Sequence, residues 1–408
     1  MCPFNCKYCL SSTISGVRFF PMDRVKDDLS KLIDAKVKQI KFVDRTFNAN
    51  KKHAMEIMNF IIDKDPEDIN FHFEISGHLI DDEMLEFLKK PKEGLFQFEI
   101  GVQSTNPETS YEIMRTTDFN RIVQVSKEIK TNNNIHQHLD LIAGLPYENY
   151  ESFERSFNDV YNIKPEKIQL GFLKLLKGSQ LRIDEEKYGY KYLDTPPYEV
   201  MENNYMKYHE IIKLKSIEEL VDKYYNEGYF KHSLEFIISN YYNSPFKFYQ
   251  EFSSYWISKN LYDMSHSRDK LYKILYDFYS EKKLTHNESF MDLIKYDYIR
   301  NNGKNPIPNW IISNKLDNSM IHEVLKDQEV LGDLSHEYRK IATKKLLKTT
   351  QIEEFQNNIF KIINNGYKVS KEDIMKQFIL FHFTKGKLIR CKTYDITNKV
   401  KELSNGLY

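Results

Sequence analysis

The sequence predicts an α/β fold in which parallel strands joined by helices form part of a barrel, followed by a mostly α-helical domain. Two patterns carry this prediction. Up to residue 195, short β-rich runs alternate with amphipathic helical stretches, the order expected for parallel strands with helical crossovers. From residue 196, after a Thr-Pro-Pro turn, the β signal fades and the pattern becomes helical. We therefore expect two domains, residues 1–195 and 196–408.

Five strands are predicted in the first domain, each a run rich in β-branched and aromatic residues. They cover residues 37–44, 71–77, 95–104, 135–146 and 167–176. Apolar residues at helical spacing predict a helix with Leu29 on its buried face before the first strand, and one with Phe157 before the fifth. Asp81 and Asp82 are predicted to cap a third helix, ahead of the third strand.

Composition excludes several classes of partner. Lys plus Arg and Asp plus Glu both number 59, so no net positive field concentrates nucleic acid or an anionic membrane. No apolar run approaches the roughly 20 residues that span a bilayer, and the N-terminus has no signal segment. Four cysteines in 408 residues, three of them within the first nine, argue against a secreted disulfide framework. We expect a cytoplasmic protein with a thiolate site and no membrane or nucleic-acid partner.

The segment CPFNCKYC places Cys2, Cys6 and Cys9 close enough to bind one metal centre from a single loop. A four-iron four-sulfur (4Fe-4S) cluster held by three cysteines keeps one iron open to a substrate or cofactor. The alternative is a zinc site, but structural zinc takes four ligands with paired spacing, and the sequence has no second cysteine pair. Cys391, the fourth cysteine, lies in a run typical of a strand or buried segment and is expected to be a small core residue.

The CxxxCxxC spacing, with the aromatic Tyr8 before the last cysteine, resembles the signature of the radical S-adenosylmethionine (SAM) superfamily. Two later segments, GVQS at 101–104 and DLIAGLP at 140–146, resemble strand motifs of oxygen-independent coproporphyrinogen oxidases and methylthiotransferases. The resemblance implies a partial TIM-like (β/α) barrel, a 4Fe-4S cluster and SAM. It further implies that an electron donor such as flavodoxin or ferredoxin reduces the cluster. The reduced cluster then cleaves SAM to methionine and a 5'-deoxyadenosyl radical.

The resemblance also implies residues that bind SAM, and chemistry in α/β barrels lies at the carboxyl ends of the strands. Arg115 is the candidate partner of the SAM carboxylate, because a guanidinium suits that group. Carboxylate and amide side chains suit the amino group and the ribose hydroxyls, and the backbone around Ile142 suits the adenine. The candidate SAM contacts are Tyr8, Asp44, Glu74, Gln103, Arg115, Asp140 and Ile142.

Several of these residues have structural alternatives. Asp44 or Asp140 could simply cap the helix that follows its strand. Glu99 could be an outward salt-bridge partner. His136 and His138 have the composition of a metal pair, but two histidines at this spacing on a buried strand are more often satisfied or site-lining groups than ligands.

Family members usually place the cysteine loop after a first barrel strand, and here only Met1 precedes Cys2. The expected barrel therefore lacks its first strand, and the cobalamin-binding domain common in the most similar relatives is absent. We expect either a fragment of a longer product or a second polypeptide that supplies the strand. An unanchored loop is ordered at an entropic cost of roughly 1 to 2 kcal/mol per residue, which predicts a weakly held cluster.

The helical region from residue 196 resembles the tail of these relatives, whose function is unknown. It is expected either to cover the barrel mouth or to serve packing and dimerisation. The sequence as a whole predicts a radical SAM enzyme acting on an unidentified substrate. Two alternatives stay open: a cobalamin-associated methyltransferase that works with a separate corrinoid domain, and an inactive fragment of a longer radical SAM protein.

Overall fold

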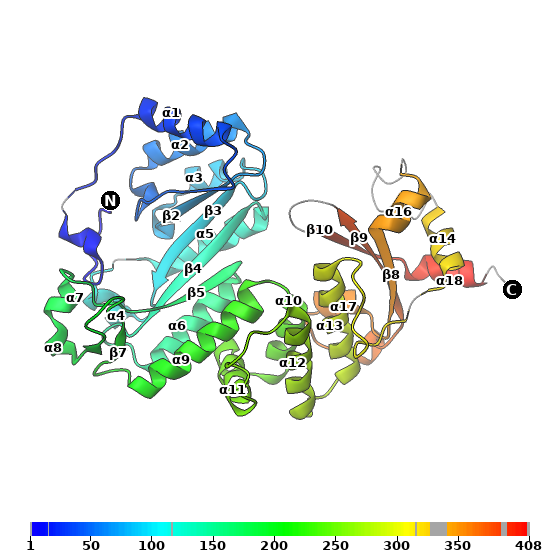
Figure 1. Ribbon diagram of the computed structural model, residues 1–408. Helices are drawn as coiled ribbons and strands as arrows, with labels where there is room; N and C mark the ends of the chain where they lie inside the picture. The colour runs from blue at the N-terminus through cyan, green and yellow to red at the C-terminus, as the bar shows by residue number, and fades with distance from the viewer. Residues whose placement is uncertain are drawn as a thin grey trace. The chain divides into compact units, whose positions relative to one another are not determined.

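The computed structural model of the chain describes residues 2–14, 16–115, 117–314, 316–326, 341–384 and 390–405. Contacts divide the chain into two compact units, Met1–Asn226 and Glu227–Tyr408 (Figure 1). The first unit extends past the predicted boundary at residue 196 because two short strands, β6 (Lys191–Tyr192) and β7 (Val200–Glu202), pair across it.

The first unit is built on a parallel sheet whose five strands lie side by side in chain order (Figure 1). The strands are β1 (Gln39–Lys41), β2 (Asn70–Ile75), β3 (Phe96–Gln103), β4 (Ile135–Ala143) and β5 (Lys167–Phe172). Each falls within or next to one of the five predicted runs. The predicted α/β fold is confirmed, since parallel neighbours in chain order with helical connections are the arrangement of a partial barrel.

Strict alternation gives this sheet one apolar face and one polar face, because successive side chains of a strand point to opposite sides. The connecting helices pack on the apolar face, where Phe71, Phe73, Phe96 and Phe98 are fully buried. Each such side chain stabilises the fold by about 1.5–3 kcal/mol. The opposite face is polar, and its side chains include Lys41, His72, Glu74, Gln97, Glu99, His138 and Asp140.

The connecting helices begin at polar caps, as N-cap preferences predict. Asp81 accepts a hydrogen bond from the Met84 amide, which confirms it as the cap of α3, and Asp82 is the first residue of that helix. The α-helices of this unit are α1 (Met22–Asp34), α2 (Lys51–Lys64), α3 (Asp82–Phe87), α4 (Pro107–Glu112), α5 (Phe119–Asn132), α6 (Tyr150–Ile163), α7 (Gln180–Ile183), α8 (Glu185–Tyr188) and α9 (Tyr208–Leu220). Shorter helical turns are η1 (Leu10–Thr13), η2 (Phe47–Ala49), η3 (Gly77–Leu79) and the π-helical η4 (Val221–Asn226).

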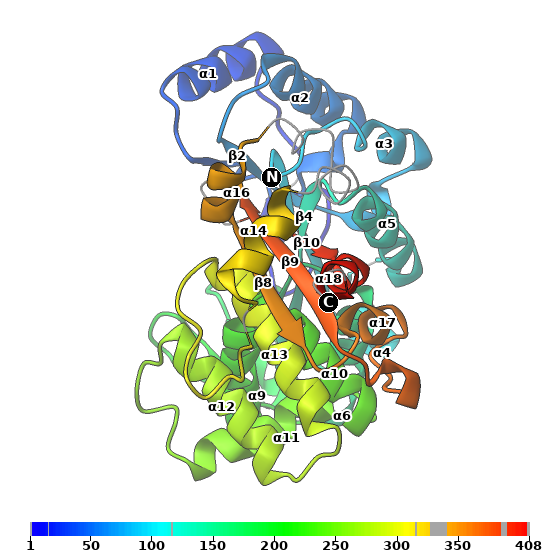
Figure 2. The same ribbon diagram turned by 90° about the vertical axis from the view of Figure 1, so that its right-hand side faces the viewer.

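The second unit is mostly helical, as predicted, and also contains an antiparallel sheet in the order β10-β9-β8 (Figure 2). The sequence indicated a strand only around Cys391. The helices are α10 (Lys231–Tyr241), α11 (Pro245–Ser258), α12 (Arg268–Glu281), α13 (Asn287–Asn302), α14 (Asn318–Lys326), α16 (Thr343–Thr349), α17 (Ile359–Asn364), α18 (Thr397–Asn405) and the short η6 (Lys371–Asp373). The strands are β8 (Thr350–Phe355), β9 (Gln377–Thr384) and β10 (Arg390–Asp395).

Helix α13 is buried along most of its length and carries charged residues inside the second unit. Asp297 accepts hydrogen bonds from the amide and the hydroxyl of Ser233. Lys295 Nζ lies 3.2 Å from Glu353 Oε2, and both side chains are at most 1% exposed. Burial raises the pKa of Asp297 to about 6, although these hydrogen bonds act to lower it. None of the described helices is long and apolar enough to cross a membrane.

Candidate functional site

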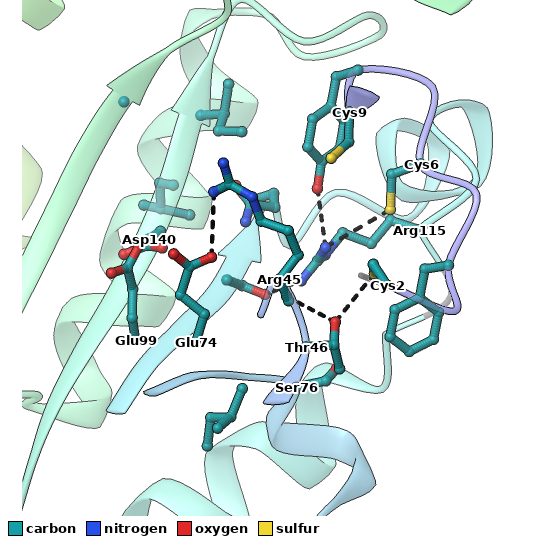
Figure 3. A pocket seen from close by; sticks show the side chains of 18 of the residues that line it. Cys2, Cys6, Cys9, Arg45, Thr46, Glu74, Ser76, Glu99, Arg115 and Asp140 are labelled. Atoms are coloured by element: carbon teal, nitrogen blue, oxygen red, sulfur yellow. Dashed lines mark hydrogen bonds and ion pairs between the residues drawn. The ribbon is translucent and has the colours of Figure 1, made fainter. Parts of the chain in front are cut away.

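A polar cavity of about 250 Å³ lies between the N-terminal cysteine loop and the carboxyl ends of the strands (Figure 3). This edge is where α/β barrels carry their chemistry. Nine of the ten predicted site residues line the cavity: Cys2, Cys6, Tyr8, Cys9, Glu74, Gln103, Arg115, Asp140 and Ile142.

Asp44 is the residue that the structure does not bring to this cavity. It lines a second, more apolar hollow beside α1 and β1. Strand β1 ends at Lys41, three residues before the predicted end, so the alternation of a strand does not extend to Asp44. Its neighbours Arg45 and Thr46 line the polar cavity.

The cysteine loop is anchored in the structure, which corrects the expectation of an unanchored loop. The Lys7 amide donates to the Ile113 carbonyl at 3.0 Å, and the Leu181 amide donates to the Lys7 carbonyl at 3.0 Å. Lys7 Nζ also forms an ion pair of 2.7 Å with Glu112, which accepts a further hydrogen bond from Tyr188. These contacts tie the loop to the end of α4 and to α7 and α8.

The three thiols border the cavity, and each has a different neighbour. Cys2 Sγ lies 3.2 Å from Thr46 Oγ1, Cys6 Sγ lies 3.9 Å from Arg115 Nη1, and Cys9 Sγ accepts from a backbone amide of its own loop. Within the described ranges, no three His, Cys, Asp or Glu side chains converge as ligands of one metal ion. Three thiols spread over one loop suit the separate corners of a 4Fe-4S cluster, whereas structural zinc takes four converging ligands. The residues present therefore fit a 4Fe-4S cluster.

Arg115 connects the cysteine loop to strand β3. Its Nη1 donates to the Tyr8 hydroxyl at 3.0 Å, and its Nη2 donates to the Gly101 carbonyl. A Cβ atom at Gly101 would collide with the side chains of Gln103 and Arg115, so this position keeps space for both. The Nε atom of Arg115 is buried and has no partner in the described part of the chain. The guanidinium is thus fixed in place with one donor unused.

Two further side chains carry buried oxygens that the described residues leave unsatisfied. Gln103 ends β3 with φ at 73°, a left-handed conformation that costs on the order of 1–3 kcal/mol for a residue other than glycine. Its Oε1 is buried and has no hydrogen-bond partner there, and the same holds for Oδ1 of Asp140. Buried polar atoms are normally hydrogen-bonded, so these atoms and Arg115 Nε fit a polar ligand such as SAM.

The structure also decides against a capping role for Asp140. Asp140 lies inside strand β4, and the following helix, α6, is capped by the Asn149 side chain, which accepts from the Ser152 amide. The side chain of Asp140 faces the cavity instead.

Three carboxylates, from Glu74, Glu99 and Asp140, gather at the end of the cavity away from the cysteines (Figure 3). Lys41 Nζ lies 3.5 Å from Glu74 and 3.2 Å from Glu99, and Arg45 Nη1 lies 3.4 Å from Glu74. Burial, and then the charges of Glu99 and Glu74, raise the pKa of Asp140 well above its usual range.

On the polar face of the sheet, three histidines lie next to Glu99 and outside the lining of the cavity. His72 Nε2 lies 2.9 Å from Glu99 Oε2, Gln97 Nε2 lies 3.4 Å from Nδ1 of both His72 and His138, and His138 Nε2 lies 3.0 Å from His136 Nδ1. Burial lowers the pKa of all three, that of His138 to about 3, so the imidazoles are neutral. These histidines hold one another and Glu99, and they form no metal site with the other described residues.

Two residues that contribute to this site were not predicted from the sequence. Glu99 shares its strand face with Gly101 and Gln103, and this alternation is the signal that could have placed it in the cavity. No local pattern identifies Glu112, because its partner Lys7 lies 105 residues away in the chain.

Together, the parallel sheet and the polar cavity at its carboxyl edge define a partial α/β barrel whose cavity is bordered by a three-thiol loop. Sequence comparison finds two family matches. Residues 1–160 match the radical SAM superfamily. Residues 186–381 match a family described as a protein of unknown function, DUF4080.

Two curated proteins are similar to the chain. An uncharacterized methyltransferase of Pyrococcus horikoshii is 28% identical over 38% of this chain and 33% of its own length. The oxygen-independent coproporphyrinogen III oxidase of Thermostichus vulcanus is 30% identical over 31% of this chain and 38% of its own length. The chain thus matches 33% and 38% of the lengths of these two relatives.

Among solved structures, coproporphyrinogen III oxidase (HemN) from Escherichia coli is 20% identical, with a TM-score of 0.40 over 54% of this chain and 50% of that chain. The radical SAM methyltransferase TsrM from Kitasatospora setae is 15% identical, with a TM-score of 0.40 over 46% and 35%. Likenesses of this size are too small to support conclusions about activity.

Proposed function

We propose that the chain is a radical SAM enzyme in which Cys2, Cys6 and Cys9 hold a 4Fe-4S cluster and the adjoining cavity binds SAM. The observation that supports this most strongly is that three thiols from one loop border the same cavity as three unsatisfied polar side chains, Gln103, Arg115 and Asp140. A 4Fe-4S cluster with bound SAM supplies a 5'-deoxyadenosyl radical that abstracts hydrogen from a substrate.

The residues of this chain then bind and orient SAM. Arg115 Nε, held by the contacts of the guanidinium to Tyr8 and Gly101, donates to the SAM carboxylate. Gln103 Oε1 and Glu74 accept from the amino group or the ribose hydroxyls, and the backbone at Ile142 lines the adenine. Asp140, the third candidate acceptor, lies beside Glu99 (Figure 3).

The test is an assay for SAM cleavage. The protein is purified without oxygen, reconstituted with iron and sulfide, and given SAM and dithionite, and 5'-deoxyadenosine is measured. We expect the product from the wild-type chain and a loss of at least about 100-fold in Cys6→Ala, because removing one ligand opens the cluster.

Cys391→Ala is the matched control for that assay. Cys391 is partly buried in β10, and burial raises the pKa of its thiol to about 12, so it is not a thiolate at neutral pH. This variant should keep wild-type activity. Equal 5'-deoxyadenosine from Cys6→Ala would contradict the role of Cys6 as a cluster ligand. An assembled cluster that leaves SAM intact would contradict the proposed activity and favour an inactive fragment of a longer radical SAM protein.

A second candidate is methyl transfer with a corrinoid brought by a separate protein. It is supported by the similarity to the Pyrococcus horikoshii protein, which is named an uncharacterized methyltransferase. A methylated product that forms only with added cobalamin would establish this function. A methylated product that forms without cobalamin would exclude it.

The proposed chemistry needs reduced thiols and a one-electron donor. All four cysteines are free. We therefore place the protein in the cytoplasm, with a donor such as flavodoxin or ferredoxin.

A further inference from the structure

We propose that Glu148 is a positioning residue of the SAM site. Glu148 lies outside the lining of the cavity and acts by holding the turn between β3 and α4, so that the Gln103 side chain at the end of β3 is kept in the cavity wall. This inference rests on the proposed function, because Gln103 is one of the residues that we expect to contact SAM.

The first support is a pair of matching hydrogen-bond paths that end on one oxygen of Glu148. Oε1 of Glu148 accepts from the Ser104 hydroxyl at 2.6 Å and from the Ser156 hydroxyl at 2.9 Å. The Ser104 hydroxyl in turn accepts from the Asn106 amide at 3.0 Å. The Ser156 hydroxyl accepts from the Thr105 amide, also at 3.0 Å. A hydroxyl that donates to a carboxylate is oriented to accept from an amide, so Glu148 sets the direction of both bonds to the turn.

The second support is the place of this turn in the chain. The turn begins directly after Gln103, whose φ of 73° is one that residues other than glycine keep only when the surrounding structure enforces it. The register between β3 and β4 also shifts between Gly101 and Gln103, so the ladder of the sheet is interrupted just before Gln103. The bonds that hold residues 104–106 therefore decide the direction in which Gln103 leaves the sheet.

The third support is that Glu148 belongs to the other strand connection that carries candidate SAM contacts. It lies in the loop between β4 and α6, after Asp140 and Ile142. The Asn106 side chain donates from Nδ2 to the carbonyl of Tyr147, the neighbour of Glu148, at 2.8 Å. The loops after β3 and β4 are thus joined at two adjacent points, which keeps the contacts from the two strands at a fixed separation.

Stability alone gives little reason for a carboxyl group at this position. Glu148, Ser104 and Ser156 are at most 3% exposed, and Oε2 of Glu148 is buried with no partner among the described residues. Burial raises the pKa of Glu148 to about 7, although the two serine hydroxyls act to lower it. A group that is costly to bury but organises a turn at the edge of a ligand cavity fits a functional role better than a purely structural one.

The experiment measures SAM affinity in variants of Glu148. Reconstituted enzyme is kept without reductant, so that SAM is not consumed, and is titrated calorimetrically with SAM. Glu148→Met keeps the length of the side chain but removes the acceptor, and it should weaken SAM binding about fivefold, the effect of losing one well-placed hydrogen bond. Glu148→Gln keeps an oxygen that accepts from both hydroxyls and should bind SAM within about twofold of the wild type.

A double-mutant cycle shows whether Glu148 acts through Gln103. Gln103→Ala by itself should also weaken SAM binding about fivefold. If Glu148 acts by positioning Gln103, adding Glu148→Met to Gln103→Ala causes little further loss. The double variant should then bind SAM about fivefold more weakly than the wild type, whereas independent effects would give about 25-fold.

Asp292→Leu is the control for a loss of stability alone. Asp292 is a buried carboxylate of the second unit, and its Oδ2 accepts from the amides of Gln356 and Asn357. This variant should lower the temperature of thermal unfolding and leave SAM affinity unchanged. Thermal unfolding of each variant shows that it is folded at the temperature of the titration.

A second route tests the same bonds if Glu148→Met does not fold. The double variant Ser104→Ala with Ser156→Ala removes the hydroxyls that lie between Glu148 and the turn. It should weaken SAM binding about as much as Glu148→Met, since the same two backbone amides lose their acceptors.

Three outcomes would overturn the inference: wild-type SAM affinity in folded Glu148→Met, a loss in Glu148→Gln as large as that in Glu148→Met, or additive losses in the cycle. Hydrogen exchange of the Thr105 and Asn106 amides, measured on the whole chain in the absence of SAM, separates this inference from the proposed function. Exchange at least about tenfold faster in Glu148→Met supports the hold of Glu148 on the turn, even if the wild-type chain binds no SAM and the proposed function fails. Unchanged exchange overturns the positioning role, even if the wild-type chain cleaves SAM.

Discussion

Asp297 in α13 is buried and Asp140 in β4 is partly buried, one in each compact unit, and their surroundings differ. Asp297 accepts hydrogen bonds from the amides of His232 and Ser233 and from the Ser233 hydroxyl. Asp140 keeps a buried oxygen with no partner among the described residues. The Asp297 carboxylate is therefore satisfied by the protein itself, whereas the Asp140 carboxylate keeps an acceptor that the described residues leave unsatisfied. The presence of hydrogen-bond partners within the protein, more than the degree of burial, distinguishes a structural carboxylate from one that belongs to a binding site.

The largest effect that tests this contrast comes from the buried ion pair of the second unit. Lys295→Met leaves Glu353 buried without its cation and should lower the free energy of unfolding of this unit by about 3–5 kcal/mol. Urea unfolding followed by tryptophan fluorescence measures it, since Trp256 and Trp310 both lie in this unit. The double variant Lys295→Met with Glu353→Leu should recover most of the loss. A single variant as stable as the wild type would show that the pair is not structural.

Glu148 in the first unit is an intermediate case, with one oxygen satisfied and one not. Its Oε1 accepts from Ser104 and Ser156, whereas its Oε2 is buried without a partner in the described structure. Burial raises its pKa to about 7 despite these hydrogen bonds.

A raised pKa in the folded state favours the protonated carboxyl. Its contribution to stability is therefore present below about pH 4.5 and is lost as the pH rises through 7. We expect Glu148→Gln to be more stable than the wild type at pH 8 by roughly 2–3 kcal/mol and similar to it at pH 4.5. Thermal unfolding at both pH values measures this, and a stability difference that does not change with pH would contradict it.

The same substitution in the two units gives the most direct comparison. Asp297→Asn removes a charged acceptor that three donors share and should destabilise the second unit by about 1–3 kcal/mol. Asp140→Asn removes a carboxyl that no described group satisfies, so it should be neutral or slightly stabilising in the absence of ligand. Hydrogen exchange resolved by unit measures both. A comparable loss of stability in Asp140→Asn would contradict the distinction between the two aspartates.

The smallest expected effect concerns the anchor of the cysteine loop. Burial acts to raise the pKa of Glu112, but hydrogen bonds from Lys7, Tyr188 and Lys187 outweigh it and lower the pKa to about 2. The anchor is therefore fully present above about pH 4.5 and is lost as the pH falls toward 2. Glu112→Gln should weaken it by about 1 kcal/mol, seen as faster amide exchange in the loop at pH 7. The variant should also show a smaller change in that rate between pH 7 and pH 3 than the wild type.

The sequence predicts the five parallel strands well because each has a marked apolar alternation of its own, such as the phenylalanines of β2 and β3. It does not predict β8 and β9, which are paired by contacts across 22 or more residues that leave no local signal. It misplaces Asp44 because β1 stops early, at Lys41. The candidate site is predicted where a strand fixes the direction of a side chain, as at Glu74, Gln103 and Asp140. It is missed where a distant segment closes the contact, as at Glu112.

The two faces of the five-stranded sheet also bear on how such a protein can change over evolutionary time. Substitutions on the polar face alter what the cavity contacts but leave the phenylalanine side that supports the fold untouched. A single residue inserted within β3 would exchange the faces and bury Glu99 in place of Phe98. Selection should therefore reject insertions in these strands while tolerating replacements at alternate positions, so that descendants can inherit the same scaffold and acquire new ligand preferences on it.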